Sequence, residues 1–514
     1  MYTNTQTLIT FILYLMVILS IGWFGYKATQ NLADYILGGR RLGKVVTALS
    51  AGASDMSGWL LMGFPGAVYL FGISYSWLAI GLIMGAWLNW RFVAARLRLY
   101  TEKCGNALTL PDYFVSRFEA KTNTLRMITA LAILTFFTIY CAAGIVASAL
   151  LFKNLFGLSY AAALWIGAFA TIFYVFIGGF LAVSWTDTVQ ASLIIAALIV
   201  APLMVVHAIG GITPSMKAVE TVATTHLDIF HGLNSIGVIS LLGWSLGYFG
   251  QPHILVRFMA AESPKTIPAA RRIGMSWMIF CLAGALAVGF LGQIYFSANP
   301  AKAGLVAADA EMVFIEVARQ LFNPWICGFL LAAILAAVMS TLACQLLVCS
   351  SALTEDIYKT FIRKTASQRE LVWCGRAMVL FVALIAIALA GDPNNQILKI
   401  VSYAWAGFGA AFGPVILLSL TWPRMTEKGA LAGIIVGGLT VVIWKQYAWL
   451  QLYEIIPGFI FASFAVVVMS LLSRPPVAIV RELFGRASVE EEIDMRLVME
   501  AEVNMPSSTR EVYE

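Results

Sequence analysis

The sequence predicts an all-α membrane protein with about thirteen transmembrane helices, two of which are interrupted. Of its 514 residues, 60% are hydrophobic and only 12% are charged, whereas a soluble domain carries about 25% charged residues. The apolar residues form blocks of roughly 20, the length that a helix needs to cross about 30 Å of hydrocarbon. Two of these blocks contain clusters of glycine, serine and proline. These observations exclude a water-soluble fold.

Thirteen apolar blocks have the length of a membrane span. No Lys or Arg precedes the first block and no small-residue cleavage pattern follows it, so we interpret it as a retained helix rather than a secretory signal. The predicted spans are 6–27, 45–71, 75–95, 124–150, 159–181, 185–208, 233–256, 273–297, 323–351, 372–390, 395–421, 429–447 and 451–473.

The basic residues predict the orientation of the chain. With the N-terminus outside, 27 of the 33 Lys and Arg residues fall in or beside the cytoplasmic loops. This asymmetry follows the positive-inside rule. The cytoplasmic segments include 28–44, 96–123, 257–272, 352–371, 422–428 and a tail from Arg474 that we expect to be partly helical or disordered.

Charge and motifs exclude several function classes. The net charge of +6 is spread between apolar blocks, which fits membrane orientation better than nucleic-acid binding. No Walker A, G-x-G-x-x-G or H-E-x-x-H pattern occurs in a suitable context. The seven cysteines form no C-x-x-C pair and are expected to be reduced packing residues. We therefore expect a transporter rather than an enzyme, with no organic cofactor and no obligatory protein partner.

The second apolar block contains the run Ser54-Asp55-Met56-Ser57-Gly58. An Asp at a helix centre costs about 2.5–3.5 kcal/mol in membrane insertion, so Asp55 should face polar partners rather than lipid. Glycine and short hydroxyl side chains allow the backbone to unwind and to bind its own freed groups. The alternative is close helix packing, where small residues are also common.

The seventh block repeats this pattern between Gly243 and Pro252. Two interrupted helices five segments apart indicate an inverted-repeat secondary transporter, with each break in the first helix of its repeat. No residue-level identity between the halves supports the repeat, which is inferred from the breaks alone.

The ninth block contains Ala337 and, three and four residues later, Ser340 and Thr341. On a helix these positions share a face. Two hydroxyls and a carbonyl, with carbonyls of an unwound helix opposite, would suit sodium. The alternative is that Thr341 bonds back to the Ala337 carbonyl and Ser340 fills a helix contact.

A solute site is expected beside the second-block break. Free N–H groups of a half-helix starting near Ser57 and Gly58 would stabilise an amino-acid carboxylate. Tyr140, Trp244 and Tyr248 would offer aromatic faces to its ammonium and apolar atoms, although an aromatic residue in a membrane helix often only packs.

These motifs resemble those of the sodium/solute symporter family over essentially the whole chain. The Gly-Gly-x-x-Ala-Val-x-x-Thr-Asp pattern marks the wider family, and the run from Ser50 to Trp59 is typical of its proline carriers. The matching stretches are Asp34 to Arg40, Ser50 to Trp59, Gly178 to Asp187, Tyr248 to Pro252 and Ala337 to Gln345.

The resemblance implies the leucine-transporter fold, with a 5+5 inverted-repeat core. That core would occupy residues 45–421, with repeats at about 45–208 and 233–421. An N-terminal helix and loop (1–44), two C-terminal helices (422–473) and a cytoplasmic tail (474–514) would lie outside it. The expected location is a bacterial cytoplasmic membrane.

The resemblance also assigns functional residues. Sodium would be bound by the carbonyls of Ala53, Met56 and Ala337 and the hydroxyls of Ser340 and Thr341, helped electrostatically by Asp55. Proline would contact Ser57, Trp59, Tyr140, Trp244, Tyr248 and Pro252, although Trp59 and Pro252 have packing as an alternative role. Arg40 and Asp187 are implicated in coupling. Asp187 lies at a predicted cytoplasmic helix end, so its alternative role is to cap that helix or to pair with a basic loop residue.

The expected activity is sodium-coupled import of L-proline by alternating access across the lipid bilayer. One alternative keeps the fold and changes the solute to another small organic molecule, such as a vitamin or sugar. Another is a membrane sensor or channel.

Overall fold

The computed structural model describes residues 5–222, 225–392, 396–447, 449–478 and most of 480–497, and these residues form helices joined by short turns. A single isolated bridge joins Leu42 to Ala261. The α-helices are α1 (Thr5–Ala28), α2 (Leu32–Leu37), α3 (Lys44–Asp55), α4 (Phe64–Phe71), α5 (Ser76–Phe92), α6 (Ala94–Lys103), α7 (Leu110–Phe118), α8 (Thr124–Phe156), α9 (Tyr160–Ile209), α10 (Ile212–Val222), α11 (Ser235–Leu242), α12 (Pro252–Ala260), α13 (Ile267–Ala298), α14 (Val313–Leu321), α15 (Pro324–Ser351), α16 (Gln368–Leu389), α17 (Ile397–Thr421), α18 (Glu427–Tyr447) and α19 (Ile455–Leu472).

Ten helices in the described part of the chain are long and apolar enough to cross a membrane, and Tyr160–Phe176 and Ser235–Gly250 are shorter apolar helices. The number differs from the thirteen predicted spans. The predicted spans 45–71 and 233–256 are each broken into short helices. The helix that corresponds to 159–181 is too short to be counted as one of the ten. Each predicted span nevertheless coincides with helical residues.

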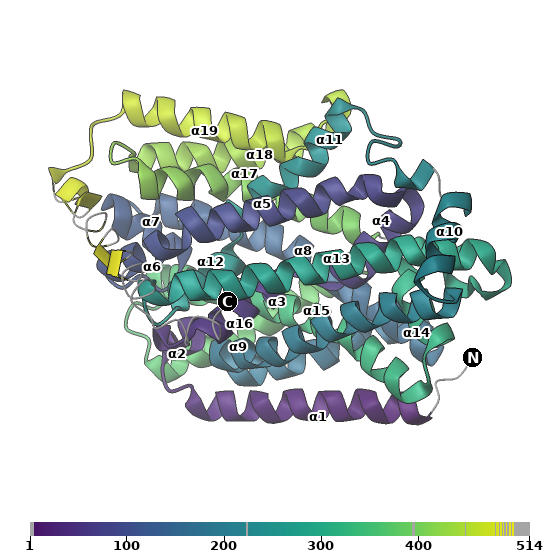
Figure 1. Ribbon diagram of the computed structural model, residues 1–514. Coiled ribbons are helices and arrows are strands. Elements are labelled where there is room, and N and C mark those ends of the chain that lie inside the picture. Colours follow the sequence, from purple (N-terminus) through teal and green to yellow (C-terminus); the bar gives the residue numbers. More distant parts are fainter. Residues whose placement is uncertain are drawn as a thin grey trace.

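The long helices run side by side, with α1 along one edge of the molecule and α18 and α19 along the opposite edge (Figure 1). The most enclosed helix is α15, because 89% of its most apolar stretch is buried, against 33% for each of α1, α18 and α19. The break between α3 and α4 and residues 243–260 of the second interrupted segment lie between these edges and are mostly buried, whereas α11 lies at the edge with α18 and α19 (Figure 1). The irregular backbone of both segments is therefore held inside protein, where it is tolerated in a membrane.

Segments predicted to be cytoplasmic lie at one end of the molecule. Figure 1 places α2, α6 and α7 at that end and α10 and α14 at the other. We call these the inner and the outer end. The bridge between Leu42 and Ala261 joins the segment before α3 to the end of α12, so both interrupted segments are connected at the inner end.

The predicted separation of the fifth span (159–181) from the sixth (185–208) is confirmed, although the break lies a few residues earlier than expected. The direction of α9 changes at Gly179, whose φ of 67° and ψ of −167° are non-helical, and residues 182–184 are already helical. The boundary is shifted because apolar blocks mark the membrane interior but not the position of a bend made by one glycine.

Gly179→Ala is expected to lower the free energy of unfolding by about 1–3 kcal/mol, because this backbone conformation is essentially restricted to glycine. A Cβ there would also lie 2.8 Å from Cδ2 of Tyr35. Thermal unfolding of the purified protein measures the effect. The matched control is Gly22→Ala in α1, where a Cβ meets nothing within 4 Å; equal melting temperatures for the two variants would contradict the prediction.

Candidate functional site

The predicted break in the second apolar block is confirmed. The helix α3 ends at Asp55, and Met56 has φ −83° and ψ 79° before the π-helical turn η2 (Trp59–Gly63) begins. In a continuous helix the Ala53 carbonyl would accept from the N–H of Ser57. That N–H instead donates to the Asp55 carbonyl at 3.0 Å, so the Ala53 carbonyl is released from helical bonding.

The same change releases a second carbonyl. A continuous helix would pair the Met56 carbonyl with the N–H of Leu60. That N–H donates to the Ser57 carbonyl at 3.0 Å instead. The break therefore frees the two carbonyls that the sequence comparison with the family had assigned to sodium.

The hydroxyls of α15 meet one of these carbonyls. Ser340 Oγ donates to the Ala53 carbonyl at 2.7 Å and lies 3.1 Å from the Ala337 carbonyl. Thr341 Oγ1 lies 3.3 Å from the Ala53 carbonyl. All four residues are buried. Thr341 thus bonds across to α3 rather than back along its own helix, and the four oxygens form a compact donor set for a hard cation.

Asp55 connects the two interrupted segments. Its Oδ2 accepts a hydrogen bond from the hydroxyl of Tyr248, which lies in the 3₁₀ turn η5 (Gly243–Gly250). Its backbone carbonyl accepts from Trp59 Nε1 at 3.2 Å. The other carboxyl oxygen, Oδ1, is buried and has no hydrogen-bond partner among the described residues. The expectation that Asp55 faces polar partners rather than lipid is confirmed.

Aromatic rings enclose the same region from the side of η5. Trp244 stacks on Trp405 of α17 and on Tyr453, with centroid separations of 6.2 and 5.5 Å. Tyr248 meets Trp405 edge-on at 5.1 Å, and Trp405 Nε1 donates to the Trp244 carbonyl at 2.9 Å. Trp405 and Tyr453 were missed by the sequence reasoning, because nothing in an apolar helix distinguishes an aromatic residue at a site from one that packs.

Tyr140 of α8 lies close enough to Asp55, Ser57 and Trp59 to interact with them electrostatically. Its hydroxyl is buried and has no hydrogen bond of regular geometry in the described part of the chain. Ser57 Oγ accepts from the Trp59 N–H at 3.4 Å, a long bond. Tyr140, Ser57 and Trp59 therefore lie within reach of one another beside Asp55.

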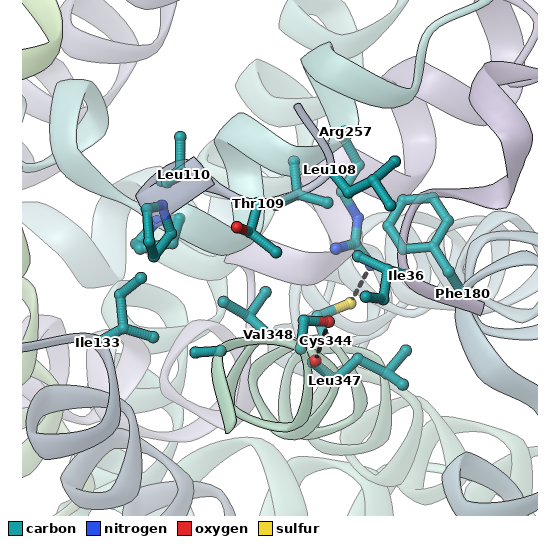
Figure 2. Close-up of a pocket in the computed structure, with 15 residues that line it drawn as sticks. Ile36, Leu108, Thr109, Leu110, Ile133, Phe180, Arg257, Cys344, Leu347 and Val348 are labelled. Carbon is teal, nitrogen blue, oxygen red and sulfur yellow. Dashed lines mark hydrogen bonds between the residues drawn. The ribbon is translucent and has the colours of Figure 1, made fainter. Parts of the chain in front are cut away.

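Pro252 begins α12 and lines a small cavity of about 20 Å³ at the inner end. Figure 2 shows Thr109 and Leu110 facing Val348 and Cys344 of α15 across this cavity, beside Arg257 of α12. Pro252 thus faces this cavity, and the side chain of the preceding Gln251 donates to the Trp405 carbonyl at 3.2 Å.

Asp187 belongs to a buried polar cluster rather than to a helix end. Ser50 Oγ donates to its Oδ2 at 2.6 Å, and Arg257 Nη2 lies 3.3 Å from the same oxygen. Arg257 also donates to Ser50 Oγ at 3.1 Å and to the Cys344 sulfur. Asp187 and Arg257 are both buried. The placement of Asp187 at a cytoplasmic helix end was wrong, as was the assignment of Arg257 to a loop.

Arg40 binds several segments at the inner end. Its guanidinium donates to Asn106 Oδ1 at 2.9 Å, to the Met259 carbonyl at 2.6 Å and to the Ala107 carbonyl at 2.8 Å. Burial, with the nearby charge of Arg98, lowers the pKa of Arg40 to about 10. Arg40 therefore stays charged at neutral pH and joins the segment before α3 to the end of α12.

A cavity of about 750 Å³ lies at the outer end. It is lined by Trp244 and Tyr453, by Gly66 and by Glu311 in the 3₁₀ turn η9 (Ala310–Met312). The carboxylate of Glu311 accepts long bonds of 3.4 Å from backbone N–H groups at the start of α17. The sequence reasoning missed Glu311. The cavity at the inner end is much smaller, about 20 Å³, and only the outer one is lined by Trp244 and Tyr453.

The stability of this outer turn is expected to depend on pH. Burial raises the pKa of Glu311 to about 7, so between pH 5 and 7 the folded state binds more protons at this carboxyl than the unfolded state does. Its contribution to stability therefore falls as pH rises through that window, by about 1–2 kcal/mol. Glu311→Gln should flatten this part of the melting-temperature profile, with Glu427→Gln at the start of α18 as control, because Glu427 is partly exposed. An unchanged slope in Glu311→Gln would contradict the assignment.

An all-helical chain whose two broken helices meet beside a buried oxygen cluster has the architecture of a helical membrane transporter. The family model described as "Sodium:solute symporter family" matches residues 35–437. The sodium/proline symporters of Salmonella typhimurium and Escherichia coli are each 64% identical to this chain over 487 residues. The alignment covers 95% of this chain and 97% of each relative. The high-affinity proline transporter PutP of Bacillus subtilis is 51% identical, covering 91% and 98%. The chain belongs to the sodium:solute symporter family.

Solved structures support the fold. A sodium-coupled sialic acid symporter in a substrate-bound outward-open state aligns with a TM-score of 0.79 at 19% identity, covering 92% of this chain and 99% of that one. MHP1, a nucleobase-cation-symport-1 family transporter in a closed conformation, aligns with a TM-score of 0.55 at 11% identity, covering 89% and 99%. At these identities the likeness concerns the fold alone.

Proposed function

We propose that this protein is a secondary symporter that imports L-proline together with sodium by alternating access. The observation that carries the sodium part is the released Ala53 carbonyl facing the hydroxyls of Ser340 and Thr341. The solute part is supported by relatives named as sodium/proline symporters at 64% identity over nearly their whole length.

We assign the roles within the site as follows. Sodium occupies the oxygen cluster, completed by the Met56 carbonyl, and Asp55 attracts the ion and connects the two interrupted segments. Proline lies between the unwound backbone and the aromatic rings, where Trp244 stacks on Trp405 and Tyr248 meets Trp405 edge-on. Its further contacts are Ser57, Trp59, Tyr140 and Pro252.

The finer architecture belongs to the same proposal. Thirteen spans place the N-terminus outside and the C-terminus in the cytoplasm of a bacterial inner membrane. Residues 45–421 form the leucine-transporter-like core of two inverted repeats, 45–208 and 233–421. Segments 1–44 and 422–473 flank it, and 474–514 form the tail. Each repeat has a break in its first helix, and the hydrogen bond between Tyr248 and Asp55 connects the two breaks. Both observations support this division.

The driving force comes from the sodium gradient and the membrane potential, which supplies about 2.3 kcal/mol per charge per 100 mV. Sodium stabilises the unwound backbone that also forms the solute site. Because the two ligands share this element, each increases the affinity for the other by the same factor.

Uptake of labelled proline into proteoliposomes tests the proposal. An inward sodium gradient should produce accumulation above the external concentration, whereas an equal potassium gradient should not. Absence of sodium-dependent accumulation would refute symport. Competition by a vitamin or sugar, but not by excess unlabelled proline, would instead assign another solute to the same fold, and flux without coupling would indicate a channel.

A further inference from the structure

The inner cavity is covered by a helical hairpin. The hairpin α6–α7 (residues 94–118) contributes Thr109 and Leu110 to the cavity wall (Figure 2). The loop of the hairpin is fixed by Arg40, and Thr109 Oγ1 donates to Asp356 Oδ1 at 3.1 Å. Widening of the cavity toward the inner end therefore requires this hairpin to move.

A segment after the last long helix packs on the outside of the same hairpin. The ring of Phe484 meets the ring of Tyr100 at a centroid distance of 5.8 Å, and the Phe484 carbonyl accepts from the Tyr100 hydroxyl at 3.0 Å. Val480 and Ala487, on the same segment, are 3% and 1% exposed. An apolar face of this segment is thus buried against the protein.

Phe484 also completes the surroundings of a buried cation. The guanidinium of Arg117 in α7 lies over the rings of Tyr100, Phe118 and Phe484, 5.8, 5.3 and 5.3 Å from their centroids. Its Nη1 and Nη2 are buried without hydrogen-bond partners among the described residues. The guanidinium is stabilised by these ring faces and by a hydrogen bond from Nε to the Ser419 carbonyl at 3.0 Å, and one of the three rings comes from the C-terminal segment.

Two ion pairs add to the contact between the C-terminal segment and the rest of the inner end, one with α6 and one with the turn before α13. Lys103 Nζ at the end of α6 lies 3.0 Å from Glu490, and Lys265 Nζ in the turn before α13 lies 3.3 Å from Asp494. The C-terminal segment thus spans from the hairpin to the connection that follows α12, the helix that carries Arg257.

We propose that Phe484, Glu490 and Asp494 of the C-terminal segment form a clamp that holds the α6–α7 hairpin closed over the inner cavity and so slows opening toward the inner end. The clamp acts through the Phe484 ring on Arg117 and through the two ion pairs. It regulates conformational exchange and goes beyond the proposed transport function, because it does not depend on which solute is carried.

Two native thiols make the clamp testable without sodium or proline. Cys344 lines the inner cavity and is buried, and Cys104 is buried at the end of α6. In the full-length purified protein, Phe484→Ala should raise the rate of maleimide modification of both thiols by roughly threefold to tenfold, measured by peptide mass spectrometry. Leu497→Ala is the control, because Leu497 is 48% exposed.

The pattern of labelling separates a clamp from local packing. Faster modification of Cys104 alone would mean that Phe484 only covers the hairpin surface, and it would overturn the proposal, as would equal rates in Phe484→Ala and Leu497→Ala. Cys281, buried in α13 away from the hairpin, should keep its rate and so report intact folding.

A charge-reversal series decides the matter if Phe484→Ala does not fold. Glu490→Lys and Lys103→Glu should each raise Cys344 modification by about twofold, because the pair is half exposed. The double variant should return to the original rate. Equal rates in all three variants and the unmodified protein would overturn the ion-pair part of the clamp and, without a Phe484 effect, the clamp itself.

Discussion

Replacing Arg257 by alanine is expected to lower the free energy of unfolding by about 3–5 kcal/mol and to abolish uptake. The variant leaves the carboxylate of Asp187 buried, with the Ser50 hydroxyl and the Cys344 thiol as its remaining hydrogen-bond partners among the described residues. Removing one partner of a buried pair is costly because the other charge has lost its compensation without regaining water. Thermal unfolding of the purified protein and sodium-dependent uptake measure the two effects.

The double variant Arg257→Met with Asp187→Leu is the informative control. Replacing both charges by apolar side chains should restore most of the stability, because no uncompensated charge remains. Uptake should stay absent if the pair is needed for coupling. Arg91→Ala, at the exposed end of α5, should change stability by less than about 0.5 kcal/mol. A stable Arg257→Ala variant would contradict the role assigned to the pair.

The break at Asp55 could be predicted from the sequence because an acid, two serines and a glycine in the middle of an apolar block are costly in a membrane unless they have a function. The same logic found Ser340 and Thr341, since their spacing alone places them on one helix face. Arg257 was misplaced for the opposite reason. A basic residue at the edge of an apolar block is expected to end the span, and its partner Asp187 is 70 positions away in sequence.

Other features have no local signal. Trp405 is one aromatic residue in a helix rich in them, and only its contact with Trp244 distinguishes it. Glu311 lies in a short turn outside the predicted spans. The bend at Gly179 depends on a backbone conformation that block lengths do not encode. Tertiary contacts set all three, so sequence reasoning could predict the class and the break but not the surroundings of the site.

The oxygen cluster proposed for sodium and the Asp187 cluster are neighbours along the same two helices. Ser50 lies three residues before Ala53 on α3, and Cys344 lies four residues after Ser340 on α15, about one helical turn in each case. A cation that draws the Ala53 carbonyl toward α15 therefore also affects the separation of Ser50 from Cys344, and with it the pair of Asp187 and Arg257. This geometry offers a direct physical route from sodium binding to the inner end.

Removing the hydroxyls of α15 should have the largest effect on sodium dependence. Thr341→Val or Ser340→Ala deletes one oxygen from the cluster around the Ala53 carbonyl. A polar contact to a charged group contributes about 1.5–3 kcal/mol, which corresponds to a roughly tenfold to hundredfold rise in the sodium concentration for half-maximal uptake. Sodium activation of labelled-proline uptake in proteoliposomes measures this shift.

The matched control is Thr129→Val. Thr129 is equally buried, but its hydroxyl bonds only to the Leu125 carbonyl of its own helix, at 2.7 Å, so the sodium requirement should not change. The proline concentration for half-maximal uptake should stay near its original value when sodium is saturating, since the hydroxyls act on proline only through the cation. If Thr341→Val and Thr129→Val have the same sodium activation, the oxygen cluster does not bind the transported ion.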